Sequence, residues 1–205
     1  PVHIQQEILS QGITPAVLGL VTSVQSAGYG LVLGAIGIIL GKKTGLWKDE
    51  RHLEKKPLMI TLAVSVVGGL VLILPDILFF GKYSQVIMDS YAVKPTVPYM
   101  IAAVLYGGVI EEVMLRLFML SLIAFILQKI FAREKELPTT GILIVANVIA
   151  ALLFAAGHLP ATAILMGITP MSLFRCFLLN VGFSPLFGWL YRKFGLRYAM
   201  LAHGG

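Results

Sequence analysis

Cysteine and charge are both scarce in this sequence of 205 residues. The single cysteine, Cys176, excludes an intrachain disulfide and a metal site built from several cysteines. Only 13% of the residues are charged, whereas 58% are hydrophobic, and the mean hydropathy is +0.88. These values lie outside the range of an ordinary soluble domain. Several apolar runs reach the roughly 20 residues needed to cross a bilayer, so we expect a polytopic membrane protein.

The net charge of +6 does not indicate nucleic-acid binding, because the basic residues fall between the apolar runs. Residues 1–14 lack the basic stretch of a signal peptide, and we expect a short interfacial segment there. The chain starts at Pro1 and stops two residues after a histidine, so we interpret it as a C-terminally truncated fragment. It shows no internal repeat, and we expect one domain over residues 1–205.

The apolar runs predict an all-α membrane bundle of about six transmembrane helices. In chain order the expected spans are 15–40, 58–80, 97–128, 141–158, 173–191 and a sixth that begins near residue 196. The third would be roughly 48 Å long as a straight helix, against a hydrocarbon core of about 30 Å, so it must tilt, kink or protrude. We expect a bend at Gly107-Gly108. Pro160 should break the fourth span, and a link of residues 159–172 without Lys or Arg should follow.

Basic residues are concentrated in alternate loops. Loops 41–57, 129–140 and 192–197 hold six, three and three Lys or Arg residues, whereas the other loops hold only Lys82 and Lys94. Cytoplasmic loops of membrane proteins carry this excess. The first set of loops is therefore expected in the cytoplasm.

Three charges within six residues interrupt the third apolar run: Glu111, Glu112 and Arg116. One charge at the centre of a membrane helix costs about 2.5–3.5 kcal/mol on insertion scales. Glu112 and Arg116 are four residues apart, so they share a helix face and can pair. Glu111 points about 100° away, so we expect one neutralised acid and one free acid. A free carboxylate inside a membrane indicates a functional site.

Other polar residues within the apolar segments each have a structural explanation when taken singly. His158 and His203 suit the membrane boundary, as do Asp76 and Arg175, which lie near span ends. Asn180 suits a hydrogen bond between helices. Taken together, a free carboxylate and two histidines can activate water and stabilise an oxyanion. They also match a metal site of two histidines and one carboxylate.

Three motifs follow one another in the second half of the chain, and neither HExxH nor GxSxG is present. The motifs are Glu111-Glu112-x-x-x-Arg116, Phe154-x-x-x-His158-Leu159, and Gly188-Trp-Leu-Tyr-Arg-Lys-Phe-Gly195 leading into Ala202-His203. In this order and spacing they resemble the CPBP family of CAAX-protease and bacteriocin-processing (Abi) intramembrane endopeptidases. The resemblance covers about residues 97–205.

The resemblance implies a role for each of five residues. Glu111 would be the general base that activates water, and Glu112 with Arg116 would be its supporting pair. His158 would help to hold the water or the base, and His203 would stabilise the tetrahedral oxyanion. In the family an Asn or Asp commonly follows the last histidine by four residues, at what would be position 207, so we expect an incomplete oxyanion site here. Family members are called metalloproteases, which leaves one divalent metal such as zinc, or no cofactor, as alternatives.

The resemblance also implies a substrate and a location. The substrate would be a peptide or protein, such as a prenylated CAAX peptide, a bacteriocin leader or a membrane-protein segment, and the protein would be a multi-pass component of a bacterial inner membrane. A second interpretation is a non-catalytic membrane protein, for example a bacteriocin-immunity factor or a scaffold. A third is an ion or proton transporter with Glu111, His158 and His203 as a relay. The third is weakened by the absence of an inverted repeat.

One expectation conflicts with this site. His158 would lie about 25 Å from the start of its span at Gly141, whereas His203 would lie only about 10 Å from the start of its own. In straight, parallel helices the two histidines would not meet.

Overall fold

The computed structural model describes residues 12, 14–49 and 52–205, and nearly all of the segment expected at the interface (1–14) lies outside them. All elements of the described part are helical. They are α2 (Pro15–Gly28), η1 (Tyr29–Leu33), α3 (Gly34–Lys43), α4 (Lys55–Leu78), η2 (Phe80–Lys82), α5 (Gln85–Ala92), α6 (Val97–Leu105), η3 (Tyr106–Glu111), η4 (Val113–Leu120), α7 (Ser121–Phe131), α8 (Thr140–Gly157), α9 (Leu159–Met166), α10 (Pro170–Phe194) and α11 (Leu196–Gly204). The predicted all-α bundle is confirmed.

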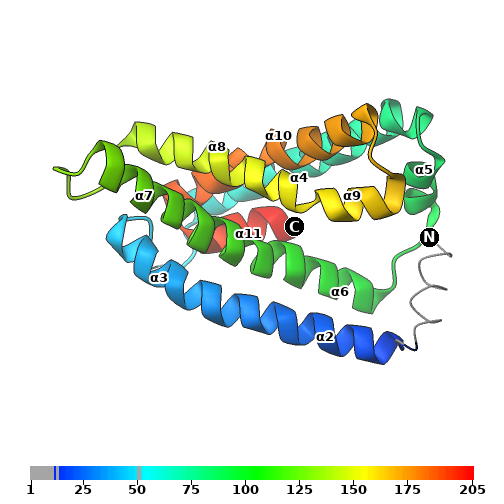
Figure 1. Cartoon of the computed structure of the whole chain (residues 1–205), viewed down its shortest axis with the longest axis horizontal. Helices are drawn as coiled ribbons and strands as arrows, with labels where there is room; N and C mark the ends of the chain where they lie inside the picture. Colours follow the sequence, from blue (N-terminus) through cyan, green and yellow to red (C-terminus); the bar gives the residue numbers. More distant parts are fainter. Residues whose placement is uncertain (1–11, 13, 50–51) are drawn as a thin grey trace.

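Four helical stretches in the described part are long and apolar enough to cross a membrane. They are Ala16–Lys43, Lys55–Lys82, Thr140–Met166 and Pro170–Phe194. They run lengthwise through the bundle, and the loops α3–α4 and α7–α8 lie at one end, opposite α5 and α9 (Figure 1). The exposed hydrophobic side chains along these helices match a lipid environment. The protein is therefore an integral membrane protein.

The run that carries the acidic motif is helical without interruption from α6 through α7, but it is not a regular α-helix. Tyr106–Glu111 and Val113–Leu120 form π-helices, so the first irregular segment includes the glycine pair where we expected a bend. Such π segments are rare and concentrate at functional sites. Gly108 has a second role: a Cβ there would lie 3.0 Å from the Cα of Gly204, so the glycine allows η3 to approach α11 closely.

The first membrane stretch is held against the acidic-motif helix by small residues. Added Cβ atoms at Gly30 and Gly34 would contact side chains of η3 and η4 at 3.5 Å. At Gly37 a Cβ would lie 2.9 Å from the backbone of Leu117. Glycines therefore set the distance between α3 and η4.

The expected break of the fourth span lies close to Pro160, and most of the link of residues 159–172 is helix. α8 ends at Gly157, and α9 runs from Leu159 to Met166. Pro160 occupies the first turn of α9, where a missing backbone N–H costs nothing. The break in the chain direction therefore lies at His158 itself.

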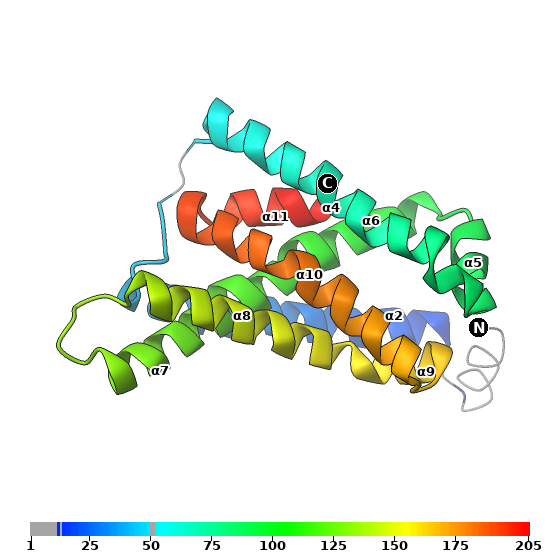
Figure 2. The ribbon, with the colours of Figure 1, turned by 90° about the horizontal axis from the view of Figure 1, so that it is seen from above.

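The short helix α11 lies inside the bundle rather than on its surface. It packs against α10, α4 and η3. Figures 1 and 2 show it enclosed by the longer helices, in red. Gly195, with φ of 116°, makes the turn that reverses the chain from α10 into α11. This turn brings His203 into the interior beside the acidic motif.

Candidate active site

The structure pairs Glu112 with Arg116, as the spacing predicts. Both side chains are fully buried, and Nε of Arg116 lies 3.1 Å from Oε2 of Glu112. The distance suits an ion pair, yet neither atom makes a hydrogen bond with the described residues. Nη2 of Arg116 donates to Oγ of Ser184 on α10 at 3.0 Å. The pair thus ties η4 to α10 from inside the protein.

His203 contacts both glutamates. Its Nδ1 lies 2.9 Å from Oε1 of Glu112, and its Nε2 lies 3.7 Å from Oε2 of Glu111. With Glu112 ionised beside Arg116, Nδ1–H is the donor in the shorter contact, which leaves Nε2 facing Glu111. We call Glu111, Glu112, Arg116 and His203 the Glu111 cluster. Its two outward members stay accessible: the side chains of Glu111 and His203 are 18% and 22% exposed.

An aromatic ring fixes the plane of His203. The rings of Phe187 and His203 are stacked, with centroids 4.9 Å apart and planes at 16°. Cζ of Arg116 lies 5.8 Å from the centroid of the same phenyl ring. Phe187 therefore contacts both the cation and the imidazole of the cluster. The sequence patterns did not indicate this role, because a phenylalanine in an apolar span is typical of the hydrophobic core.

His158 lies near the Glu111 cluster but does not join it directly. Its Nδ1 is 2.9 Å from the backbone oxygen of Phe154, one turn earlier, and its ring meets the Phe154 ring edge-on at 4.4 Å. The Phe154 ring also approaches His203, with centroids 6.5 Å apart. The charge of Glu111 interacts with both histidines. The structure therefore gathers all five predicted site residues in one region.

The expected separation of the two histidines is wrong. α11 begins within the bundle, and its end lies level with the junction of α8 and α9 along the long axis (Figure 1). The error came from treating the sixth span as a helix that starts at the membrane boundary. Gly107 completes the approach: a Cβ there would lie 3.7 Å from Nε2 of His203 and 3.9 Å from Oε2 of Glu111.

The metal site that the resemblance leaves open as one alternative has no preformed group of three ligands in the described part of the chain. Within residues 12, 14–49 and 52–205, no three His, Cys, Asp or Glu side chains gather as a group that could hold a metal ion. Nδ1 of His203 contacts Glu112 and Nδ1 of His158 contacts a backbone oxygen, so Nε2 is the ring nitrogen of each histidine that these contacts leave for another partner. We therefore derive no step through a metal.

A second charged cluster joins α4, α5 and α10, and the sequence analysis missed it. Nε and Nη2 of Arg175 donate to the two oxygens of Asp76 at 2.7 and 2.6 Å, and the Tyr91 hydroxyl donates to Oδ2 of Asp76 at 3.0 Å. We call these three residues the Asp76 cluster. Burial, and then the negative charge of Asp76, raise the pKa of Tyr91 to about 12. Asp76 and Arg175 were expected singly at the interface, and the pairing of distant spans gave no sequence signal.

The prediction for Asn180 is also wrong. Its Nδ2 donates to the backbone oxygen of Cys176 at 2.7 Å, within the same helix, rather than to a neighbouring helix. A hydrogen bond to the carbonyl four residues earlier satisfies the amide locally. Asn180 therefore takes no part in either cluster.

The fold is that of an integral membrane protein whose interior holds a histidine between two carboxylates. A family model described as type II CAAX prenyl endopeptidase Rce1-like matches residues 93–205, more than half of the chain. The chain belongs to this family, which confirms the resemblance drawn from the motifs and makes it a CAAX-protease-like membrane endopeptidase at the level of the family. Comparisons with curated proteins and with solved structures gave no match.

Proposed function

We propose that this chain hydrolyses a peptide bond inside the membrane, with Glu111 as the base that activates water. The observation that carries the proposal is the facing pair of Oε2 of Glu111 and Nε2 of His203, 3.7 Å apart and both partly exposed. This separation is longer than a hydrogen bond, so each atom remains available to a third group. A carboxylate and an imidazole that converge on one point can supply a base and an oxyanion donor.

In the proposed reaction Glu111 accepts a proton from water while the water oxygen bonds to the scissile carbonyl carbon. The carbonyl oxygen becomes an oxyanion, and protonated His203 donates to it through Nε2–H. When the C–N bond breaks, the proton held by Glu111 moves to the leaving nitrogen. The products are a carboxylic acid and an amine, which balances the addition of one water molecule.

Glu112 and Arg116 act in this proposal through His203. The contact of 2.9 Å between Glu112 and Nδ1 orients the imidazole. Arg116 in turn holds the carboxylate of Glu112 in place, since its Nε lies 3.1 Å from Oε2 of Glu112. His158 would hold the attacking water, because its Nδ1 is occupied by the Phe154 carbonyl and its Nε2 is left for a polar partner.

The substrate is proposed as a peptide with a membrane-associated segment, and the location as a bacterial inner membrane. Three probes represent the classes that suit a site within the bilayer: a farnesylated CAAX peptide, a bacteriocin leader peptide and a transmembrane peptide. Cleavage would be measured with the purified full chain in liposomes. Activity before and after treatment with a chelator, followed by addition of zinc, decides between a metal-assisted reaction and one that uses glutamate alone.

The decisive variant is Glu111→Gln, which keeps the shape of the side chain and removes the base. Cleavage should be abolished while the protein remains folded and inserted. The matched control is Glu134→Gln, which removes the same charge from an exposed position in the α7–α8 loop. Proteolysis retained by Glu111→Gln would contradict the assignment of Glu111 as the base. If the unaltered protein cleaves none of the three peptides, the immunity-factor or scaffold interpretation is favoured.

A further inference from the structure

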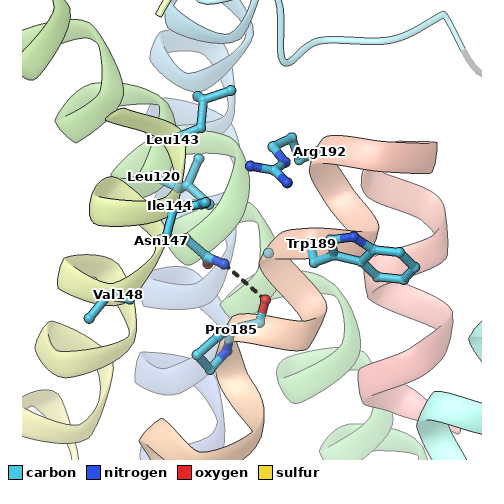
Figure 3. A pocket seen from close by; sticks show the side chains of 9 residues that line it. Leu120, Leu143, Ile144, Asn147, Val148, Pro185, Trp189 and Arg192 are labelled. Carbon is cyan, nitrogen blue, oxygen red and sulfur yellow. Dashed lines mark hydrogen bonds between the residues drawn. The ribbon is translucent and has the colours of Figure 1, made fainter. Parts of the chain in front are cut away.

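A groove between α8 and α10 lies outside the proposed active site. It encloses about 260 Å³. Its apolar walls include Leu143, Ile144 and Val148 of α8 and Trp189 of α10. Figure 3 shows Arg192 at the upper end of this groove and Asn147 below it.

The walls of the groove are held at a fixed spacing. Nδ2 of Asn147 on α8 donates to the backbone oxygen of Pro185 on α10 at 2.9 Å. Gly188 permits this approach, since a Cβ there would collide with the Asn147 amide. The Asn147 amide bonds α10 at the place where Gly188 leaves room for it, so the packing of α8 against α10 fixes the shape of the groove.

Arg192 gives the groove a charge preference. It is half-buried in the last turn of α10, and Figure 3 shows its guanidinium turned from α10 toward the α8 side of the groove. It is the charged residue among those that line the groove. The same end of the bundle carries the basic loops 41–57 and 129–140, so this groove opens in the leaflet where anionic headgroups attract basic residues.

We propose that the groove binds an anionic phospholipid of this leaflet. The phosphate pairs with Arg192, and one acyl chain lies against Leu143, Ile144 and Val148. The side chains of Ile144 and Val148 are 52% and 43% exposed on a membrane-spanning helix, so both face the acyl chains of the bilayer. A guanidinium matches the geometry of a phosphate group.

Such a lipid would support the candidate active site from outside. α8 carries Phe154 and His158, and α10 carries Ser184 and Phe187, which contact the Glu111 cluster. A ligand that bridges α8 and α10 therefore stabilises the arrangement of both. The proposal itself does not depend on catalysis and is tested by binding.

The test uses the purified full chain in detergent, titrated with phosphatidylglycerol or with phosphatidylcholine of the same acyl chains, with bound lipid counted by native mass spectrometry. Phosphatidylglycerol should bind more tightly. Arg192→Gln should weaken its binding about tenfold, as expected for a hydrogen bond to a charged group. Lys193→Gln, an exposed neighbour with the same charge, should weaken it less than about fivefold, the effect of one basic residue near an anionic surface.

A second variant tests the acyl-chain part of the site. Ile144→Trp fills the groove and should reduce the binding of both lipids, while soluble glycerol phosphate should compete weakly because it lacks the chain. The proposal is overturned if the two lipids bind equally, if Arg192→Gln and Lys193→Gln have the same effect, or if Ile144→Trp leaves binding unchanged.

Discussion

The bundle holds two charged clusters that are built in opposite ways. In the Asp76 cluster one carboxylate meets one guanidinium through two parallel hydrogen bonds, and a phenol adds a third. In the Glu111 cluster the imidazole of His203 faces both carboxylates, whereas the guanidinium of Arg116 pairs with Glu112. Nη1 of Arg116 and Oε2 of Glu112 are buried there without a hydrogen-bond partner among the described residues.

The difference indicates that the Asp76 cluster stabilises the bundle, whereas the Glu111 cluster is arranged to react. The bidentate pair of Asp76 and Arg175 satisfies its own charges and joins two spans far apart in sequence, so it needs no other partner. The Glu111 cluster carries an excess of acid, and its outer atoms face accessible space. Buried polar groups that are not fully satisfied mark sites with another purpose.

The largest expected difference between the two clusters is in their effect on peptide cleavage. Glu111→Gln should lower kcat/KM by about a hundredfold to ten-thousandfold, the range for loss of a general base. Asp76→Asn should leave kcat of the folded protein unchanged, since the described hydrogen bonds of Asp76 go to Tyr91 and Arg175 rather than to the Glu111 cluster. Peptide cleavage in liposomes, normalised to folded protein, measures both. Equal losses from the two variants would contradict the division between the clusters.

The next effect is on stability. Arg116→Ala leaves the buried carboxylate of Glu112 without its cation and should cost about 3–5 kcal/mol of unfolding free energy. Reversible unfolding in mixed micelles measures it. The double variant Glu112→Gln with Arg116→Met removes both charges and should recover part of the loss. If the double variant is no more stable than Arg116→Ala, the uncompensated charge is not the cause.

A smaller loss is expected from the Asp76 cluster. Asp76→Asn removes hydrogen bonds to a charged partner and should cost about 1.5–3 kcal/mol, because Arg175 is partly exposed and regains water. The pKa of Tyr91 should fall below about 12, since the charge of Asp76 contributes to raising it while burial remains. Because the pKa of Tyr91 is higher in the folded protein than in the unfolded chain, the neutral phenol contributes stability to the fold. This contribution is fully present below pH 10 and is lost as the pH rises toward about 12. Tyrosinate absorbance during an alkaline titration checks the shift.

The smallest effect concerns the ring that fixes His203. Phe187→Leu should lower kcat up to about tenfold with little change in KM, because a stacked pair contributes about 0.5–1.5 kcal/mol beyond its buried area. Phe183→Leu is the matched control: its ring meets Phe187 edge-on at 5.3 Å and has no ring contact with His203 among those described. Equal changes in kcat for both variants would assign Phe187 to general packing.

The sequence supported the parts of the structure that depend on local spacing. The pairing of Glu112 with Arg116 followed from the four-residue interval, and the family followed from the order of the three motifs. The depth of His203 did not follow, because it depends on where the turn at Gly195 lies within the bundle. The Arg175 to Asp76 bond joins residues 99 positions apart, and periodicity along one helix carries no information on such pairs.

The π-helical stretch from Tyr106 to Leu120 has a consequence for how this protein can change. A π turn holds one more residue than an α turn, so deletion of a single residue there would let the segment relax into a regular helix. Side chains beyond the relaxed turn would keep their direction, because the π turn had absorbed the extra residue, whereas side chains within the turn would lose their present faces. Glu111 ends the first π segment and Glu112 joins it to the second, so both carboxylates that face His203 belong to the part that a one-residue deletion would reshape.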